Sequence, residues 1–268
     1  MSKEMKDFAV GSLEYWKNQW LGKVFEMEDG DFVKVVEYRK SRSITVEFLK
    51  TGFTLNTRTD RVLEGKLKDR LKPSVYGVGI IGECVISTNQ KHHKEYRIWE
   101  GMLDRCYNPI TQKKQPAYIG CSASEFFLYY PNFKEWCNNQ IGFGLKDDNG
   151  KSFALDKDIL IKGNKVYSED TCCFVPPEIN SLMAGCKRKK GSTMVGTAYD
   201  HKLKKFRSSI VKRGVKYHLG CYATELEAFS VYKFEKESYI KEVAEKWRQQ
   251  LGAEVYETLM SYEIETTD

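Results

Sequence analysis

Alternating hydrophobic and polar positions dominate the first third of the chain. The segments FVKVVEYR (32–39) and SITVEFL (43–49) repeat with the period of two that is typical of half-buried strands, and a polar turn separates them. Two glycines punctuate KTGFTLNTRTDRVLEG (50–65) in the manner of another hairpin. Several short strands in succession predict a small β-barrel, which we expect to occupy residues 1–88.

The middle of the chain changes to helical spacing. KEYRIWEGMLDRCY (94–107) places aromatic and aliphatic side chains on one helical face. A second helix is predicted over SASEFFLYYPNFKEWCNNQ (122–140), with a serine cap and with Pro131 as a kink or break.

Three alternating segments near the C-terminus predict an antiparallel sheet followed by one helix. They are TMVGTAY (193–199), KKFRSSIVK (204–212) and VKYHLGCY (215–222). Thr224 and Glu227 have the spacing of a capping box, so we expect a helix from there to about Gln250. Residues 190–250 would form this domain, and residues 251–268 an acidic C-terminal tail.

Strand alternation separates a buried face of this sheet from an outward face. We expect the core positions to be Phe206, Ser208, Ile210, Tyr217 and Leu219. The outward face would then carry Lys205, Arg207, Ser209, Lys216 and His218.

Composition describes an ordinary folded protein, because 41% of the 268 residues are hydrophobic and 30% are charged. No apolar run approaches the length of a membrane span, and the first residues are too charged for a signal peptide. The eight cysteines lack the spacing of a zinc site, which favours a reducing cytoplasm and no zinc. We expect neither a membrane partner nor a nucleotide cofactor.

Charge is distributed unevenly, although the net value is only +6. Residues 186–218 carry eleven Lys or Arg and one acid, whereas residues 219–268 carry eleven acids and five bases. A polyanion-binding face backed by an acidic helix would produce this asymmetry. The densest basic run consists of Lys187, Arg188, Lys189 and Lys190. Taken alone, that run could equally be a solvated loop.

The stretch LDKDILIKGNKVYSEDTCCFVPPEIN (155–180) resembles the HNH endonuclease family in the form common among bacteriophages. The resemblance implies a ββα-metal core, with two strands, an intervening turn and a following helix, within residues 89–185. Asp156 and Asn180 would then be metal ligands, and Asn164 would brace the turn. Oxygen ligands of this type suit Mg²⁺ or Mn²⁺, which the resemblance implies if the protein is an active enzyme.

Lys157 stands where the family has its histidine base. Histidine suits that role because it titrates near neutrality, whereas neutralising a free lysine at pH 7 costs about 4–5 kcal/mol. Three alternatives stay open. The site is inactive and keeps DNA binding, or Asp158 is the base and Lys157 stabilises the transition state, or the catalytic residues lie elsewhere. The Asp-Lys-Asp triplet could also be a plain strand end.

The segments VGTAY, KKFRSSI and YHLGCYATELEA are similar to the ethylene-response-factor (APETALA-type) DNA-binding domain, which phage HNH proteins often carry. This resemblance implies that the outward face enters the DNA major groove. Arg207 is then the candidate for a bidentate guanine contact, while Lys205 and Lys216 would contact phosphates. The family has more arginines and a tryptophan on this sheet.

Together these features predict an α+β, phage-type protein that binds double-stranded DNA and has a homing-type HNH nuclease-like core. The alternative is a catalytically inactive protein that binds DNA or a host protein and regulates or blocks host processes. A third possibility is a protein-binding module that uses the barrel as its contact surface. A phage-encoded protein would act in the bacterial cytoplasm.

Overall fold

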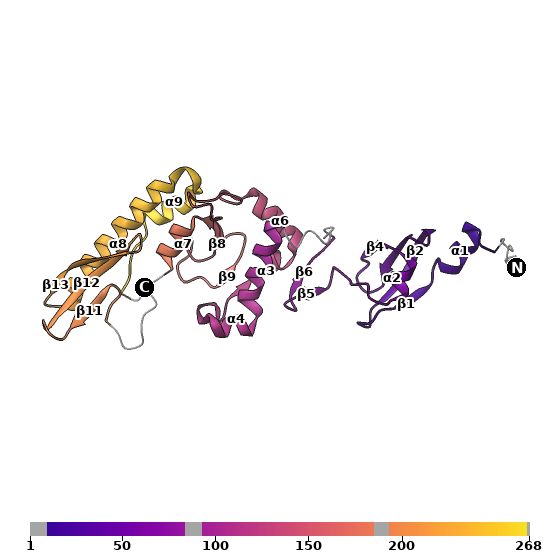
Figure 1. Cartoon of the computed structure of the whole chain (residues 1–268), viewed down its shortest axis with the longest axis horizontal. Helices are drawn as coiled ribbons and strands as arrows, with labels where there is room; N and C mark the ends of the chain where they lie inside the picture. Colours follow the sequence, from indigo (N-terminus) through magenta and orange to yellow (C-terminus); the bar gives the residue numbers. More distant parts are fainter. Residues whose placement is uncertain (1–9, 84–92, 185–192, 267–268) are drawn as a thin grey trace. The chain divides into compact units, whose positions relative to one another are not determined.

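Helices and antiparallel sheets occur throughout the chain, which confirms the α+β class (Figure 1). The computed structural model describes residues 10–83, 93–184 and 193–266. Two compact units divide the chain: residues 1–104 with 128–132, and residues 105–127 with 133–268.

The first unit is built on an antiparallel meander with the strand order β1-β2-β3-β4. Its elements are α1 (Leu13–Trp20), β1 (Val24–Glu26), β2 (Phe32–Lys40), β3 (Ser43–Phe48), β4 (Thr54–Thr57), α2 (Thr59–Leu63), β5 (Pro73–Val75), β6 (Gly79–Ile80) and most of α3 (Lys94–Tyr107). Strands β2 and β3 confirm the two alternating segments. Residues 50–65, expected as a hairpin, instead form one strand and the short helix α2.

The expected closed barrel does not form within the described residues. Closure requires the two end strands of a sheet to pair with each other, but β1 and β4 are short edge strands with one neighbour each. The core instead lies on one face of the open sheet. Its most buried strand side chains are Val33, Val35, Ile44, Val46 and Phe48, each at most 1% exposed.

The second unit contains the remaining elements in whole or in large part. They are α4 (Pro109–Lys114), η2 (Pro116–Tyr118), β7 (Ser122–Ala123), α5 (Glu125–Leu128), α6 (Tyr130–Asn139), β8 (Ala154–Asp156), β9 (Val166–Tyr167), β10 (Cys173–Val175), α7 (Pro177–Met183), β11 (Thr197–Asp200), β12 (Lys205–Lys212), β13 (Val215–Tyr222), α8 (Glu225–Trp247), η3 (Arg248–Gln250) and α9 (Ala253–Met260). The helix expected over 122–140 is broken into α5 and α6, because Pro131 is tolerated only in the first turn of a helix.

Strand β8 pairs antiparallel with β10, and Asp156 lies opposite Cys173 in the register. A connection that contains β9 joins the two strands. One residue after β10, α7 begins and lies against β8. The observed order is therefore strand, connection, strand, helix. The paired strands are only three residues long each.

The second unit also contains the antiparallel sheet β11-β12-β13, with α8 along one side of it (Figure 1). Thr224 caps α8 with the expected capping box to Glu227. Ser208 and Ile210 are buried as expected, at 0% and 3% exposure. Tyr217, expected in the core, is 49% exposed, because it lies on the edge strand β13 while α8 packs mainly on β12.

Residues 251–266 were expected to belong to an acidic tail, but in the structure they fold back onto α8. Val255 and Leu259 lie one turn apart on α9, and Leu251 precedes the helix with the same spacing. All three are at most 6% exposed, so one face of α9 is apolar and buried. Ile264 is held by its backbone: its N–H donates to Glu237 Oε1 and its carbonyl accepts from Lys233 Nζ.

Candidate functional site

The outward face of the sheet β11-β12-β13 gathers the side chains expected to bind DNA. Lys205, Arg207, Lys216 and His218 are exposed, and Ser209 is half-buried. Antiparallel pairing sets Ser209 opposite His218, so strands β12 and β13 contribute to the same face. An open hollow of about 440 Å³ lies on this face. It is lined by Ala198, Asp200, Leu203, Arg207, Ser209, Lys216, His218 and Cys221.

The basic run expected to add phosphate contacts lies outside the described residues. It consists of Lys187, Arg188, Lys189 and Lys190, between α7 and β11. The charge on the described face therefore comes from Lys205, Arg207 and Lys216, with Asp200 as the acidic member of the hollow.

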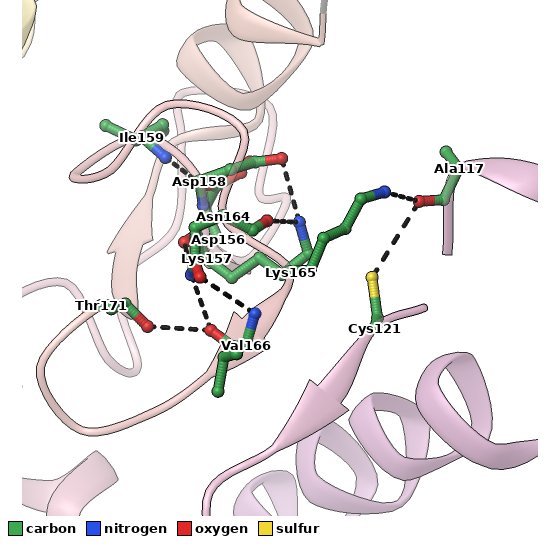
Figure 2. A network of polar contacts seen from close by, with 10 residues as sticks. All are labelled: Ala117, Cys121, Asp156, Lys157, Asp158, Ile159, Asn164, Lys165, Val166 and Thr171. Carbon is green, nitrogen blue, oxygen red and sulfur yellow. Dashed lines mark hydrogen bonds and ion pairs between the residues drawn. The ribbon is translucent and has the colours of Figure 1, made fainter. Parts of the chain in front are cut away.

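The strand end at Asp156 places two carboxylates close together. Asp156 is half-buried, and its Oδ1 accepts the backbone N–H groups of Asp158 and Ile159, both at 2.8 Å (Figure 2). Burial, followed by the negative charge of Asp158, raises the pKa of Asp156 to about 6. A crowded carboxylate pair of this kind attracts either a proton or a cation.

Lys157 points into the protein, where its ammonium group is fully engaged. The residue is 6% exposed. Its Nζ donates to the Asn164 carbonyl at 2.8 Å and to Asp158 Oδ2 at 3.0 Å (Figure 2). It also lies 5.8 Å from the centre of the Tyr167 ring. Asp158, Asn164 and Tyr167 thus surround the end of the Lys157 side chain in the protein interior.

The Asn164 side chain also makes hydrogen bonds within the connection between β8 and β10. Its Nδ2 donates to the carbonyls of Lys157 and Val166, both at 2.7 Å, and its Oδ1 accepts the Val166 N–H at 3.0 Å (Figure 2). The side chain of Lys157 donates to the Asn164 carbonyl, and the side chain of Asn164 donates to the Lys157 carbonyl. These two hydrogen bonds hold residues 157 and 164 together. The amide oxygen of Asn164 is directed at the backbone and stabilises the turn.

Asn180 lies in the middle of α7, the helix that rests against β8. It is half-buried, and its backbone N–H and carbonyl make helical bonds to Pro176 and Ala184. Within the described residues its side-chain amide makes no hydrogen bond. The fold thus brings the elements of Asp156 and Asn180 together and leaves the Asn180 amide available.

Two residues that the sequence did not single out contribute to this region. Tyr167 is 2% exposed, and its ring is contacted by the Arg105 guanidinium at 5.3 Å as well as by Lys157. Arg105 also lies 5.5 Å from the ring of Tyr118. Burial raises the pKa of Tyr167, so the phenol stays neutral beside both cations. No local pattern could have indicated this cluster, because its members come from separate parts of the chain.

The oxygen donors on β8 and α7 are of the chemical type that a hard divalent cation takes. No cluster of three or more His, Cys, Asp or Glu side chains suited to a metal occurs in the described ranges. Burial raises the pKa of Cys172 to about 12, so this neighbouring thiol is protonated and is a poor ligand. Asp156 and the Asn180 amide remain as oxygen donors, and Mg²⁺ is commonly held by one or two carboxylates plus water.

The chain matches no protein-family model, no curated protein and no solved structure. Among its described helices, none combines the length and the apolar character needed to cross a membrane.

Proposed function

We propose that this protein binds double-stranded DNA through the outward face of the sheet β11-β12-β13. The observation that carries the proposal is the exposure of Lys205, Arg207 and Lys216 on one face of a narrow antiparallel sheet. Strands β12 and β13 form a two-stranded antiparallel ribbon within this sheet, and such a ribbon fits the major groove of a duplex, where phosphates flank it on both sides.

The polar groups of this face suit such a ligand. Lys205 and Lys216 are exposed and take part in no ion pair within the described residues, so each can contact a phosphate without losing an internal partner. The basic run at residues 187–190 precedes the sheet in the sequence and would supply further phosphate contacts.

A salt titration tests this proposal. Affinity for a fluorescently labelled duplex is measured by anisotropy at increasing salt, and its logarithm should fall linearly with the logarithm of salt concentration, by a slope of about 0.9 for each phosphate contacted. Absence of duplex binding at low salt, or binding that is insensitive to salt, would contradict the proposal.

A second candidate function is metal-dependent cleavage of the bound DNA. The observation that favours it is the crowded pair of Asp156 and Asp158 beside α7, with the Asn180 amide unengaged in the described residues. A bound Mg²⁺ or Mn²⁺ would stabilise charge on the scissile phosphate. Lys157 is a poor candidate for the base because its ammonium bonds to Asp158 and Asn164, whereas the half-exposed Asp158 carboxylate can accept a proton.

Plasmid nicking with Mg²⁺ or Mn²⁺ separates an enzyme from an inactive binder. For an enzyme we expect slow nicking that is lost in Asp156→Asn, while duplex affinity is retained. Duplex binding with no nicking under either metal would favour the inactive protein. Absence of both activities would favour the interpretation that a host protein is its partner.

A further inference from the structure

One acidic side chain lies among the cations of the outward face, and it is held close to Arg207. Asp200 Oδ2 is 3.6 Å from Arg207 Nε. The Asp200 side chain is 17% exposed, whereas that of Arg207 is 52% exposed. The Asp200 side chain is thus largely sheltered, whereas about half of the Arg207 side chain stays accessible.

Asp200 is itself fixed by the turn between β11 and β12. Its Oδ1 accepts the backbone N–H of Lys202 at 2.9 Å and that of Leu203 at 3.1 Å. These hydrogen bonds, with Leu203 the stronger influence, lower the pKa of Asp200, so the group is ionised at neutral pH. With one oxygen bonded to the turn, the other is the oxygen that lies near Arg207.

The neighbours of Arg207 leave its outer edge open. In the sheet register Arg207 lies between Ala198 on β11 and Cys221 on β13, and both side chains are small. Within the described residues Asp200 is the acidic partner of Arg207. The closest contact is made by Nε, and within the described residues no other hydrogen bond or ion pair engages the guanidinium, whose side chain lines the hollow.

We propose that Asp200 is a positioning residue that determines specificity, holding Arg207 so that its terminal nitrogens present a paired donor edge to guanine in duplex DNA. Guanine is the base whose major-groove edge carries two adjacent acceptors, O6 and N7. Without a fixed partner, an exposed arginine samples many rotamers and can turn to a phosphate instead. This inference rests on the proposed function of the sheet.

Asp200→Asn is the decisive variant, because it preserves the turn and removes the charge. An asparagine oxygen can still accept from Lys202 and Leu203, whereas its neutral amide no longer attracts the guanidinium. Glu242→Gln is the matched control. It removes one negative charge from α8 in the same unit, where Glu242 pairs with Arg213 rather than Arg207.

The probes are a duplex library with a randomised centre, the duplex that the parent protein enriches, and that duplex with its guanine replaced. For the parent we expect a clear preference for guanine at one position. In Asp200→Asn this preference should fall about 3- to 10-fold, the loss expected when one side chain must be ordered on binding. Affinity for unselected library DNA should stay equal or rise slightly. Glu242→Gln should keep the guanine preference.

A double-mutant cycle distinguishes positioning from a merely structural role. Once Arg207 is replaced by alanine, Asp200→Asn should change guanine preference no further, because both substitutions act through the same contact. Full guanine preference in Asp200→Asn, or no guanine preference in the parent, would overturn the inference. Failure of the parent to bind even unselected duplex would instead contradict the proposed function.

Discussion

The segment from Asp156 to Val166, in the first part of the β8–β10 connection, and the outward face of the sheet β11-β12-β13 both carry lysine side chains. These lysines differ in whether they bond to the protein or stay exposed. In the connection, the side chains of Lys157 and Asn164 bond to the protein itself. On the sheet, Lys205 and Lys216 have no internal ion pair within the described residues and are exposed. Lys157 has 7% of its side chain exposed, against 52% for Arg207. Burial and internal partners thus distinguish a cation that stabilises the fold from a cation that is available to a ligand.

Replacing Lys157 should cause the largest change in stability. Lys157→Ala removes a buried ammonium and leaves the Asn164 carbonyl and the Asp158 carboxylate without this partner, which should lower the free energy of unfolding by about 3 kcal/mol. Urea unfolding of the whole protein measures this loss of free energy. The matched control Lys216→Ala should stay within about 0.5 kcal/mol. Equal effects of the two substitutions would show that Lys157 is not structural.

Asn164→Ala should cost somewhat less, about 2 kcal/mol. Three hydrogen bonds of its amide are lost, but the connection is partly exposed, so water replaces some of them. Asn138→Ala, at an exposed position of α6, provides the comparison and should change the unfolding midpoint little. If Asn164→Ala also leaves the unfolding midpoint unchanged, the hydrogen bonds between Lys157 and Asn164 contribute nothing measurable to stability.

Asp156→Asn should stabilise the protein, by about 2 kcal/mol at pH 7 in the presence of a chelator. Burial raises the folded-state pKa of Asp156 to about 6, above that of an unfolded aspartate. The folded protein therefore binds this proton more tightly, and ionising the group costs stability as the pH rises from about 4 to 6. The gain in Asp156→Asn should be largest above pH 6 and vanish near pH 4. A gain that does not depend on pH would contradict this cause.

Local patterns were sufficient to predict several elements of the fold. Alternation located β2, β3 and the three strands of the C-terminal sheet, and the Thr224–Glu227 spacing located the start of α8. The i, i+4 apolar spacing of Leu251, Val255 and Leu259 was also present in the sequence, but the acidic character of the segment obscured it. The predicted burial of Tyr217 was wrong because alternation does not indicate how far a helix covers an edge strand.

The partners of the candidate site residues could not be predicted in the same way. Nothing near Lys157 in the sequence indicates that its ammonium is buried beside Tyr167, because Tyr167 reaches it only through the folding of the connection. The Asp200–Arg207 pair likewise depends on the register of β11 against β12. Residue types and alternation identified the outward face, whereas the burial and the partners of Lys157 are visible only in the three-dimensional contacts.

The salt dependence of duplex affinity in the double variant Lys205→Ala/Lys216→Ala tests the central claim most directly. If this face holds phosphates, the plot of log affinity against log salt should flatten by a slope of about 0.9 for each lysine removed. The fold should be unaffected, because both side chains are exposed. A parental slope in the double variant would show that DNA, if bound, contacts another surface, and would contradict the assignment of the sheet as the DNA-binding face.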